Sequence, residues 1–264
     1  MESDKKLELV WSQEFDETAG TTPDSTFWNY DIGTGHDGWG NQEHEFYVDT
    51  QAVTDGNGNL IITADRITAD RAHEFTDPRV EFVSSRLLTH KKVSFQYGRI
   101  EASIKTPLGQ GTWPALWMLG NQFESIGWPQ CGEIDILEVG DQKDLMHFTL
   151  HGPGYFGNDG LTKTHIDATH SLNEGFHEYA IEWLPGQIDW FFDGEHISRQ
   201  TSADAQARGS EWVFDQEFFL ITNLAMGGMF VPLGIDPSLN SAQLTIDYIR
   251  HYSIDGVGSA RIHS

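Results

Sequence analysis

The chain has 264 residues and a formal net charge of −24, because 40 Asp and Glu residues outnumber 16 Lys and Arg residues. Nucleic acid is excluded as an expected partner, since its phosphates need a basic surface, and a strongly sulfated or uronic-acid polymer would be repelled. A neutral partner fits this charge. The single cysteine, Cys131, allows no intramolecular disulfide, and the absence of any run of 18 apolar residues predicts no membrane span.

Short segments with alternating polar and apolar residues follow one another along the chain and predict an all-β fold. The expected strands lie at residues 7–15, 27–32, 59–64, 97–105, 111–119, 131–139, 145–152, 176–183, 187–192, 195–197, 218–225 and 244–252. Residues 66–80 read as an exposed insertion, 203–212 as one short helix and 256–264 as a tail. No linker or repeat interrupts the pattern. We therefore expect one domain over residues 1–264, with a core at about 7–254, built as a β-jelly-roll sandwich of two antiparallel sheets.

One predicted strand carries three carboxylates in an otherwise apolar run. On a regular strand Glu133 and Asp135 point to one face, while Ile134 and Ile136 point into the core. Glu138 breaks this alternation, so we predict a β-bulge that returns it to the face of the other acids, as bulges beside active sites do. Repulsion among three acids should raise the pKa of at least one, which a general acid–base pair requires. An acidic, solvent-facing strand edge is the alternative.

The segment Gly-Glu-Ile-Asp-Ile-Leu-Glu, residues 132–138, resembles the active-site strand of glycoside hydrolase family 16. Its Glu-x-Asp-x-x-Glu pattern is similar to the bulged form of laminarinases, which are endo-β-1,3-glucanases. Lichenases and xyloglucan enzymes have the shorter Glu-x-Asp-x-Glu form. Further similar segments run from Trp11 to Tyr252 in the family's order. The resemblance implies a concave cleft that binds a neutral β-glucan, and hydrolysis of its internal β-1,3 bonds with retention of configuration.

The resemblance also implies roles for the three acids. Glu133 is expected to be the nucleophile that forms a glycosyl-enzyme, and Glu138 the acid that protonates the leaving oxygen and then activates water. Asp135 is expected to share a proton or hydrogen bond between them. A bulged strand can hold the two glutamates at the roughly 5–5.5 Å separation of retaining enzymes. The residues alone do not decide which glutamate takes which role.

Five other residues match sugar-binding positions of the family. They lie in Trp-Gly-Asn-x-Glu, Ser-x-Arg and Trp-Pro-Ala-x-Trp segments and in the strand after the acids: Asn41, Arg86, Trp113, Trp117 and His151. The two tryptophans are four residues apart, so a regular strand places both indoles on one face. Core packing is the alternative for the tryptophans, a polar turn for the asparagine, and a surface cation for the arginine.

The family resemblance further implies a structural Ca²⁺ on the convex side, held by main-chain oxygens and one aspartate. The matching positions are Glu14, Gly58 and Asp247, and Ca²⁺ prefers such oxygen ligands. Sodium or no metal at all is the alternative. We expect no cofactor for catalysis.

Location and alternative functions follow from the same resemblance. Polymeric glucans do not enter cells, so we expect a secreted protein, extracellular or periplasmic, although the first residues are not a signal peptide. We also expect a monomer. The alternatives are an enzyme for mixed-linkage β-1,3-1,4-glucan or a galactan, or a non-catalytic β-glucan-binding protein, which would usually lack the acids.

Overall fold

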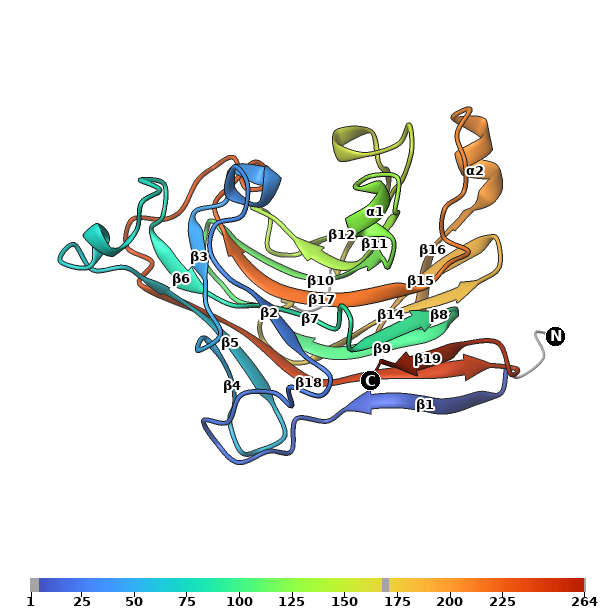
Figure 1. Cartoon of the computed structure of the whole chain (residues 1–264), viewed down its shortest axis with the longest axis horizontal. Helices are drawn as coiled ribbons and strands as arrows, with labels where there is room; N and C mark the ends of the chain where they lie inside the picture. Colours follow the sequence, from blue (N-terminus) through green and yellow to red (C-terminus); the bar gives the residue numbers. More distant parts are fainter. Residues whose placement is uncertain (1–4, 168–170, 264) are drawn as a thin grey trace.

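The computed structural model describes residues 5–167 and 171–263. In this part of the chain two curved β-sheets lie face to face, with only short helical segments (Figure 1). The helical segments are η1 (Gly38–Gln42), η2 (Ala72–Glu74), α1 (Phe123–Ile126), η3 (Gly157–Asp159) and α2 (Ser202–Ala207). The predicted all-β sandwich is confirmed. No helix within the described ranges is long and apolar enough to cross a membrane.

The first sheet has ten strands among the described residues. They are β1 (Leu7–Gln13), β3 (Glu45–Tyr47), β4 (Ala52–Thr54), β5 (Leu60–Arg66), β6 (Phe82–Ser84), β9 (Gly98–Lys105), β14 (His177–Leu184), β15 (Gln187–Phe192), β16 (Glu195–Thr201) and β18 (Ser241–Ile254). Their order is β16-β15-β14-β9-β18-β5-β6-β3, with β1 paired to β18 and β4 to β5. The pair β3–β6 is parallel, whereas the long central pairs β9–β18 and β9–β14 are antiparallel.

The second sheet has nine strands in the same described ranges. They are β2 (Asn29–Asp31), β7 (Arg86–Leu88), β8 (Val93–Gln96), β10 (Thr112–Gly120), β11 (Glu133–Val139), β12 (Leu145–His151), β13 (Leu161–Ile166), β17 (Phe218–Met226) and β19 (Ser259–Ile262). Their order is β13-β12-β11-β10-β17-β7-β2, and β8 joins β17 to β19. The predicted tail at 256–264 is therefore wrong for the residues of β19. They occupy the open edge of β8, and Ala260 packs against the core.

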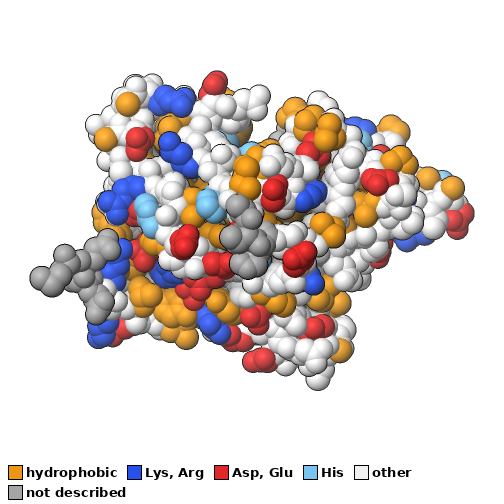
Figure 2. All heavy atoms as spheres, turned by 180° about the vertical axis from the view of Figure 1, so that it is seen from behind, with side chains coloured by type: hydrophobic (Ala, Val, Ile, Leu, Met, Phe, Trp, Pro, Cys, Tyr) orange, Lys and Arg blue, Asp and Glu red, His pale blue; other side chains and the backbone are white. Residues whose placement is uncertain are grey.

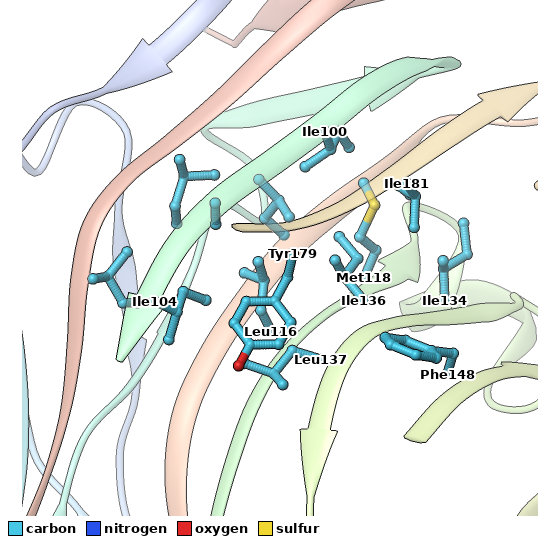
Figure 3. Close-up of a cluster of buried hydrophobic side chains, with 14 of the residues drawn as sticks. Ile100, Ile104, Leu116, Met118, Ile134, Ile136, Leu137, Phe148, Tyr179 and Ile181 are labelled. Atoms are coloured by element: carbon cyan, nitrogen blue, oxygen red, sulfur yellow. The ribbon is translucent and has the colours of Figure 1, made fainter. Parts of the chain in front are cut away.

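The inner faces of the two sheets bury apolar side chains against each other (Figure 3). Ile100 and Ile104 of β9 face this layer from one sheet, and Leu116 and Met118 of β10 face it from the other, all with no exposed surface. Burial of each such side chain stabilises the fold by about 1.5–3 kcal/mol. Because strand residues alternate between faces, β10 presents Trp113 and Trp117 on the opposite, outer face of its sheet.

Loops rise on two sides of that outer face and form the rims of a cleft. One rim contains η1 and β3, and the other contains α1 and the loop that carries η3 (Figure 1). Seen from behind, the upper outline of the molecule is indented between these rims (Figure 2). β10, β11 and β17 form the floor, so the acidic strand lies at the bottom of the cleft.

Candidate active site

The acidic strand β11 contains the predicted bulge. Its register slips by one residue between Asp135 and Glu138 in the pairings with both β10 and β12. Ile136 and Leu137, two successive residues, are both fully buried in the core. The extra residue restores Glu138 to the cleft face, where it joins Glu133. The strand is also held from the opposite sheet, because Trp190 Nε1 of β15 donates to the main-chain oxygen of Asp135 at 2.8 Å.

His151 lies beside the first two acids, as predicted. Its Nε2 is 3.3 Å from Asp135 Oδ2 and 3.7 Å from Glu133 Oε1. Its Nδ1 accepts a hydrogen bond from the main-chain N–H of Gly157 at 3.1 Å. Nδ1 is therefore the acceptor, and the proton on Nε2 faces the two carboxyl groups. The imidazole thus favours negative charge at this end of the strand.

Two of the acids, Asp135 and Glu138, favour their protonated forms. Burial and the charge of Glu133 raise the pKa of Asp135 well above its usual range. Burial and the charges of Asp135 and Glu133 also raise the pKa of Glu138, and His151 and an N–H donor from Trp113 oppose this only in part. Glu138 therefore favours its protonated form, as the expected general acid should.

Trp113 supports Glu138 and lines the cleft. Its Nε1 donates to Glu138 Oε1 at 3.0 Å. Its ring stacks on Phe230, with ring centres 4.8 Å apart and planes 27° apart. His147, which pairs with Glu138 across the strands, contacts the edge of the same phenylalanine. The hydrogen bond to Glu138 and the stacking on Phe230 thus fix the indole of Trp113 beside the acid.

Arg86 lies between two indole rings on the β17–β7 side of the acids. Its guanidinium is 4.7 Å from the ring centre of Trp39 and 4.8 Å from that of Trp117, which is the geometry of cation–π contacts. Its Nε lies 3.0 Å from Asp31 Oδ2. Trp117 Nε1 donates to Asn223 Oδ1 at 2.8 Å. The predicted residues Arg86 and Trp117 therefore belong to one wall of the cleft.

Asn41 follows Trp39 in η1, on the same rim. Its Nδ2 donates to Glu43 Oε1 at 3.1 Å. Glu43, Tyr47 and Asn223 also belong to this wall, and none of the three was predicted as a site residue. Glu43 and Tyr47 could have been identified from the spacing of Glu43, Glu45 and Tyr47, because alternate positions of an extended segment share one face.

Two exposed aromatic residues stand at the opposite side of the acids. Trp128 and Phe156 have 40% and 46% of their surface exposed. Their ring centres are 5.4 Å apart, and Trp128 lies 5.9 Å from the ring of His151. The cleft therefore has aromatic surfaces on both sides of the acidic strand, which suits the flat faces of pyranose rings.

Two of the predicted calcium residues, Glu14 and Gly58, lie close together. Gly58 has a φ of +86°, and a Cβ at this position would lie 3.9 Å from the main-chain oxygen of Glu14 and 3.6 Å from Asp16 Oδ1. The Glu14 carboxylate is bound by Arg250 at 2.9 and 2.7 Å, which leaves its main-chain oxygen as the ligand. Asp247 follows Ile246, whose partner on β5 is two residues beyond Gly58. These hard oxygen donors fit Ca²⁺.

One group of three His, Cys, Asp or Glu residues with metal-ligand spacing was found in residues 5–167 and 171–263. It consists of Glu133, Asp135 and His151, whose ligand atoms lie within 4.8 Å of one another. Two of these residues are the expected catalytic acids.

Comparisons with known proteins identify the family of the chain. The family model "Glycosyl hydrolases family 16" matches residues 40–250. The "Beta-glucanase" of Rhodothermus marinus is 42% identical over 254 residues, covering 93% of this chain and 85% of that protein.

Two solved structures share the fold over nearly the whole chain. The endo-β-1,3-glucanase of Pyrococcus furiosus has a TM-score of 0.86 and 37% identity, covering 96% of this chain and 97% of its own. The laminarinase catalytic domain of Thermotoga maritima has a TM-score of 0.84 and 38% identity, covering 94% and 98%. With its bulged acidic strand and its cleft in the same jelly-roll fold, the chain is a glycoside hydrolase and belongs to glycoside hydrolase family 16.

Proposed function

We propose that the protein is a retaining endo-glucanase that hydrolyses internal β-1,3-glucosidic bonds of laminarin-type glucans. The observation that carries the proposal is the bulged strand, which brings Glu138 to the cleft face of Glu133 and favours its protonated form. The names of similar proteins, a laminarinase and an endo-β-1,3-glucanase among them, support the choice of substrate.

In the first step Glu133 acts as the nucleophile. Its carboxylate attacks the anomeric carbon, the glycosidic C–O bond breaks, and the bonding electrons pass to the leaving oxygen. Glu138 gives its proton to that oxygen, so the leaving chain departs as a neutral alcohol. The product is a covalent glycosyl-enzyme with inverted configuration at the anomeric carbon.

In the second step water enters on the side that the leaving chain has vacated. Glu138, now ionised, takes one proton from the water as its oxygen attacks the anomeric carbon. The bond to Glu133 breaks, which regenerates the carboxylate and restores the β configuration. Asp135, whose pKa is raised by burial and by the charge of Glu133, supports the change of charge on Glu133 in this proposal, with the Nε2–H of His151 beside both.

The other predicted residues bind the sugar chain in this proposal. Trp113 offers its indole on the floor and Trp117 offers its indole on the wall, where Arg86 and Asn41 offer polar groups. The outline of the molecule is indented between the two rims (Figure 2). We expect the glucan chain to lie across this indentation and to be cut internally, which is an endo mode of action.

The remaining properties belong to the same proposal. We expect one catalytic domain over residues 1–264, acting as a secreted monomer on a neutral β-glucan, without nucleic acid or a membrane as partner. A structural Ca²⁺ would be held by the main-chain oxygens of Glu14 and Gly58 and by the carboxylate of Asp247. When bound it would supply cross-links on the convex side and take no part in catalysis.

Substrate specificity tests the proposal directly. Purified protein is incubated in parallel with laminarin, lichenan, agarose and xyloglucan, and the release of reducing sugar is measured. Laminarin should be cleaved fastest, and short oligosaccharides should appear early. Degradation of agarose with laminarin untouched would overturn the proposed substrate, and loss of activity in Glu133→Ala excludes a contaminating enzyme.

A further inference from the structure

We propose that a buried hydrogen-bond chain joins Asn41 to Trp117 and fixes the wall of the cleft for glucan binding. Glu43, Tyr47 and Asn223, which lie between them, are then positioning residues. The inference rests on the proposed function, because it concerns the same cleft. We call the five residues the wall relay.

The contacts of the wall relay are continuous. Asn41 Nδ2 donates to Glu43 Oε1 at 3.1 Å, and Tyr47 Oη donates to Glu43 Oε2 at 3.2 Å. Asn223 Nδ2 donates to the same Tyr47 oxygen at 3.1 Å, and its Oδ1 accepts from Trp117 Nε1 at 2.8 Å. Each hydrogen bond orients the next residue of the chain. The orientations of the Asn41 amide and of the Trp117 indole are therefore coupled through one network.

The middle of the relay is buried, which makes its bonds costly to break. Tyr47 has no exposed surface, and Glu43 and Asn223 are each 5% exposed. A buried polar group that loses its partner costs more than the hydrogen bond itself is worth. The relay is therefore held in one arrangement rather than exchanged with water.

A second buried acid lies beside Glu43. Glu45 is fully buried, and its Oε2 accepts from the main-chain N–H of Met226 at 2.6 Å. Burial and the charge of Glu43 raise the pKa of Glu45 well above its usual range. Glu45 therefore favours its neutral form, and the Glu43 carboxylate accepts from Asn41 and Tyr47 without a second negative charge beside it.

The rim that carries Asn41 needs such an anchor. Asp37, Trp39 and Gln42 have φ values of +51°, +53° and +57°, a left-handed region that is unfavourable for residues other than glycine. Strained backbone persists only where its surroundings hold it. The main-chain oxygen of Asn41 accepts from Met229 N–H at 2.8 Å, and a Cβ at Gly228 would come within 2.8 Å of that oxygen.

The relay has a consequence for recognition. Its bond to Glu43 uses one of the two N–H groups of the Asn41 amide and fixes the orientation of that amide, so its carbonyl oxygen is held in place to accept from a sugar hydroxyl. Trp117 and Trp39 clamp Arg86 between their rings. Fixing Trp117 therefore also fixes the guanidinium, and the relay positions a hydroxyl acceptor and a cation on one wall.

Tyr47→Phe tests the relay with no change of charge. It removes the hydroxyl that joins Glu43 to Asn223. In NMR spectra of the ¹⁵N-labelled protein, the indole N–H of Trp117 and the side-chain amide of Asn41 should both shift. The control is Tyr179→Phe, whose buried hydroxyl has no hydrogen-bond partner among the described residues, and it should move neither signal. Unmoved signals in Tyr47→Phe would overturn the relay, whether or not the protein cleaves laminarin.

Kinetics then separate positioning from general destabilisation. We expect Tyr47→Phe to raise KM for long laminari-oligosaccharides roughly tenfold, with kcat little changed and with little effect on a short aryl laminaribioside. Glu43→Gln should act in the same way, whereas the neighbouring Glu81→Gln, outside the relay, should not. In a double-mutant cycle, Tyr47→Phe should raise KM much less when Asn41→Ala is already present. Equal losses on short and long substrates, or additive losses in the cycle, would refute the relay. A wild type inactive on laminarin would instead refute the proposed function.

Discussion

The hydrogen bond from Trp113 to Glu138 offers a sharp test of the acid's role. Trp113→Phe keeps an aromatic ring against Phe230 and removes the single N–H that reaches Glu138 Oε1 at 3.0 Å. A hydrogen bond to a charged group contributes about 1.5–3 kcal/mol. The proton is only partly transferred in the transition state, so roughly half of this energy, about 0.75–1.5 kcal/mol, is lost there. We expect kcat/KM to fall by a factor between about four and about thirteen.

Trp113→Phe should also shift the pH profile of kcat/KM in a predictable direction. The N–H bond stabilises ionised Glu138, so its removal raises the pKa of Glu138 further. The basic limb of kcat/KM against pH reports the loss of the proton that Glu138 must donate. This limb should therefore move to higher pH in Trp113→Phe.

Trp117→Phe is the matched control for this experiment. Its Nε1 donates to Asn223 and reaches no catalytic acid. The variant should weaken binding but leave the basic limb in place. A basic limb that moves to lower pH in Trp113→Phe, or moves equally in both variants, would refute the assignment of Glu138 as the acid.

Three further predictions test other parts of the account. With a dinitrophenyl glucoside and azide, Glu138→Ala should give the β-azide and Glu133→Ala the α-azide, and NMR of the products would show reversed roles if the configurations were exchanged. A chelator should lower the melting temperature of the wild type and leave that of Asp247→Ala unchanged, because a ligand bound to the native state stabilises it. Identical melting curves of the wild type with and without chelator would argue against the calcium site. Since burial and Glu133 raise the folded-state pKa of Asp135, the wild type should lose stability as pH rises above the unfolded-state pKa of about 4, and Asp135→Asn should lose less over the same rise in pH in urea unfolding. An equal loss of stability in the wild type and in Asp135→Asn would contradict the raised pKa of Asp135.

Local pattern was sufficient to predict the sandwich and the bulge. Alternation along β10 and β11 identified the core residues, and the broken parity at Glu138 required an extra residue before it. The tail prediction failed for a physical reason. β19 is only four residues long and mostly exposed, so it has too little apolar pattern of its own, and its conformation depends on the open edge of β8.

Long-range contacts account for what the sequence left open in the site. Tyr47 and Asn223 meet across 176 residues of chain, and no local pattern encodes such a pairing. The aromatic pair of Trp128 and Phe156 likewise depends on where two loops end. The acids could be predicted because all three lie on one strand, where spacing alone determines the face that each side chain occupies.

Trapping the glycosyl-enzyme tests the central claim most directly. A 2-deoxy-2-fluoro laminaribioside with a dinitrophenyl leaving group forms the covalent intermediate readily but hydrolyses slowly from it. Mass spectrometry of the intact protein should show one added disaccharide, and peptide mapping should place it on Glu133. A label on Glu138, or an unlabelled protein that still hydrolyses laminarin, would contradict the account.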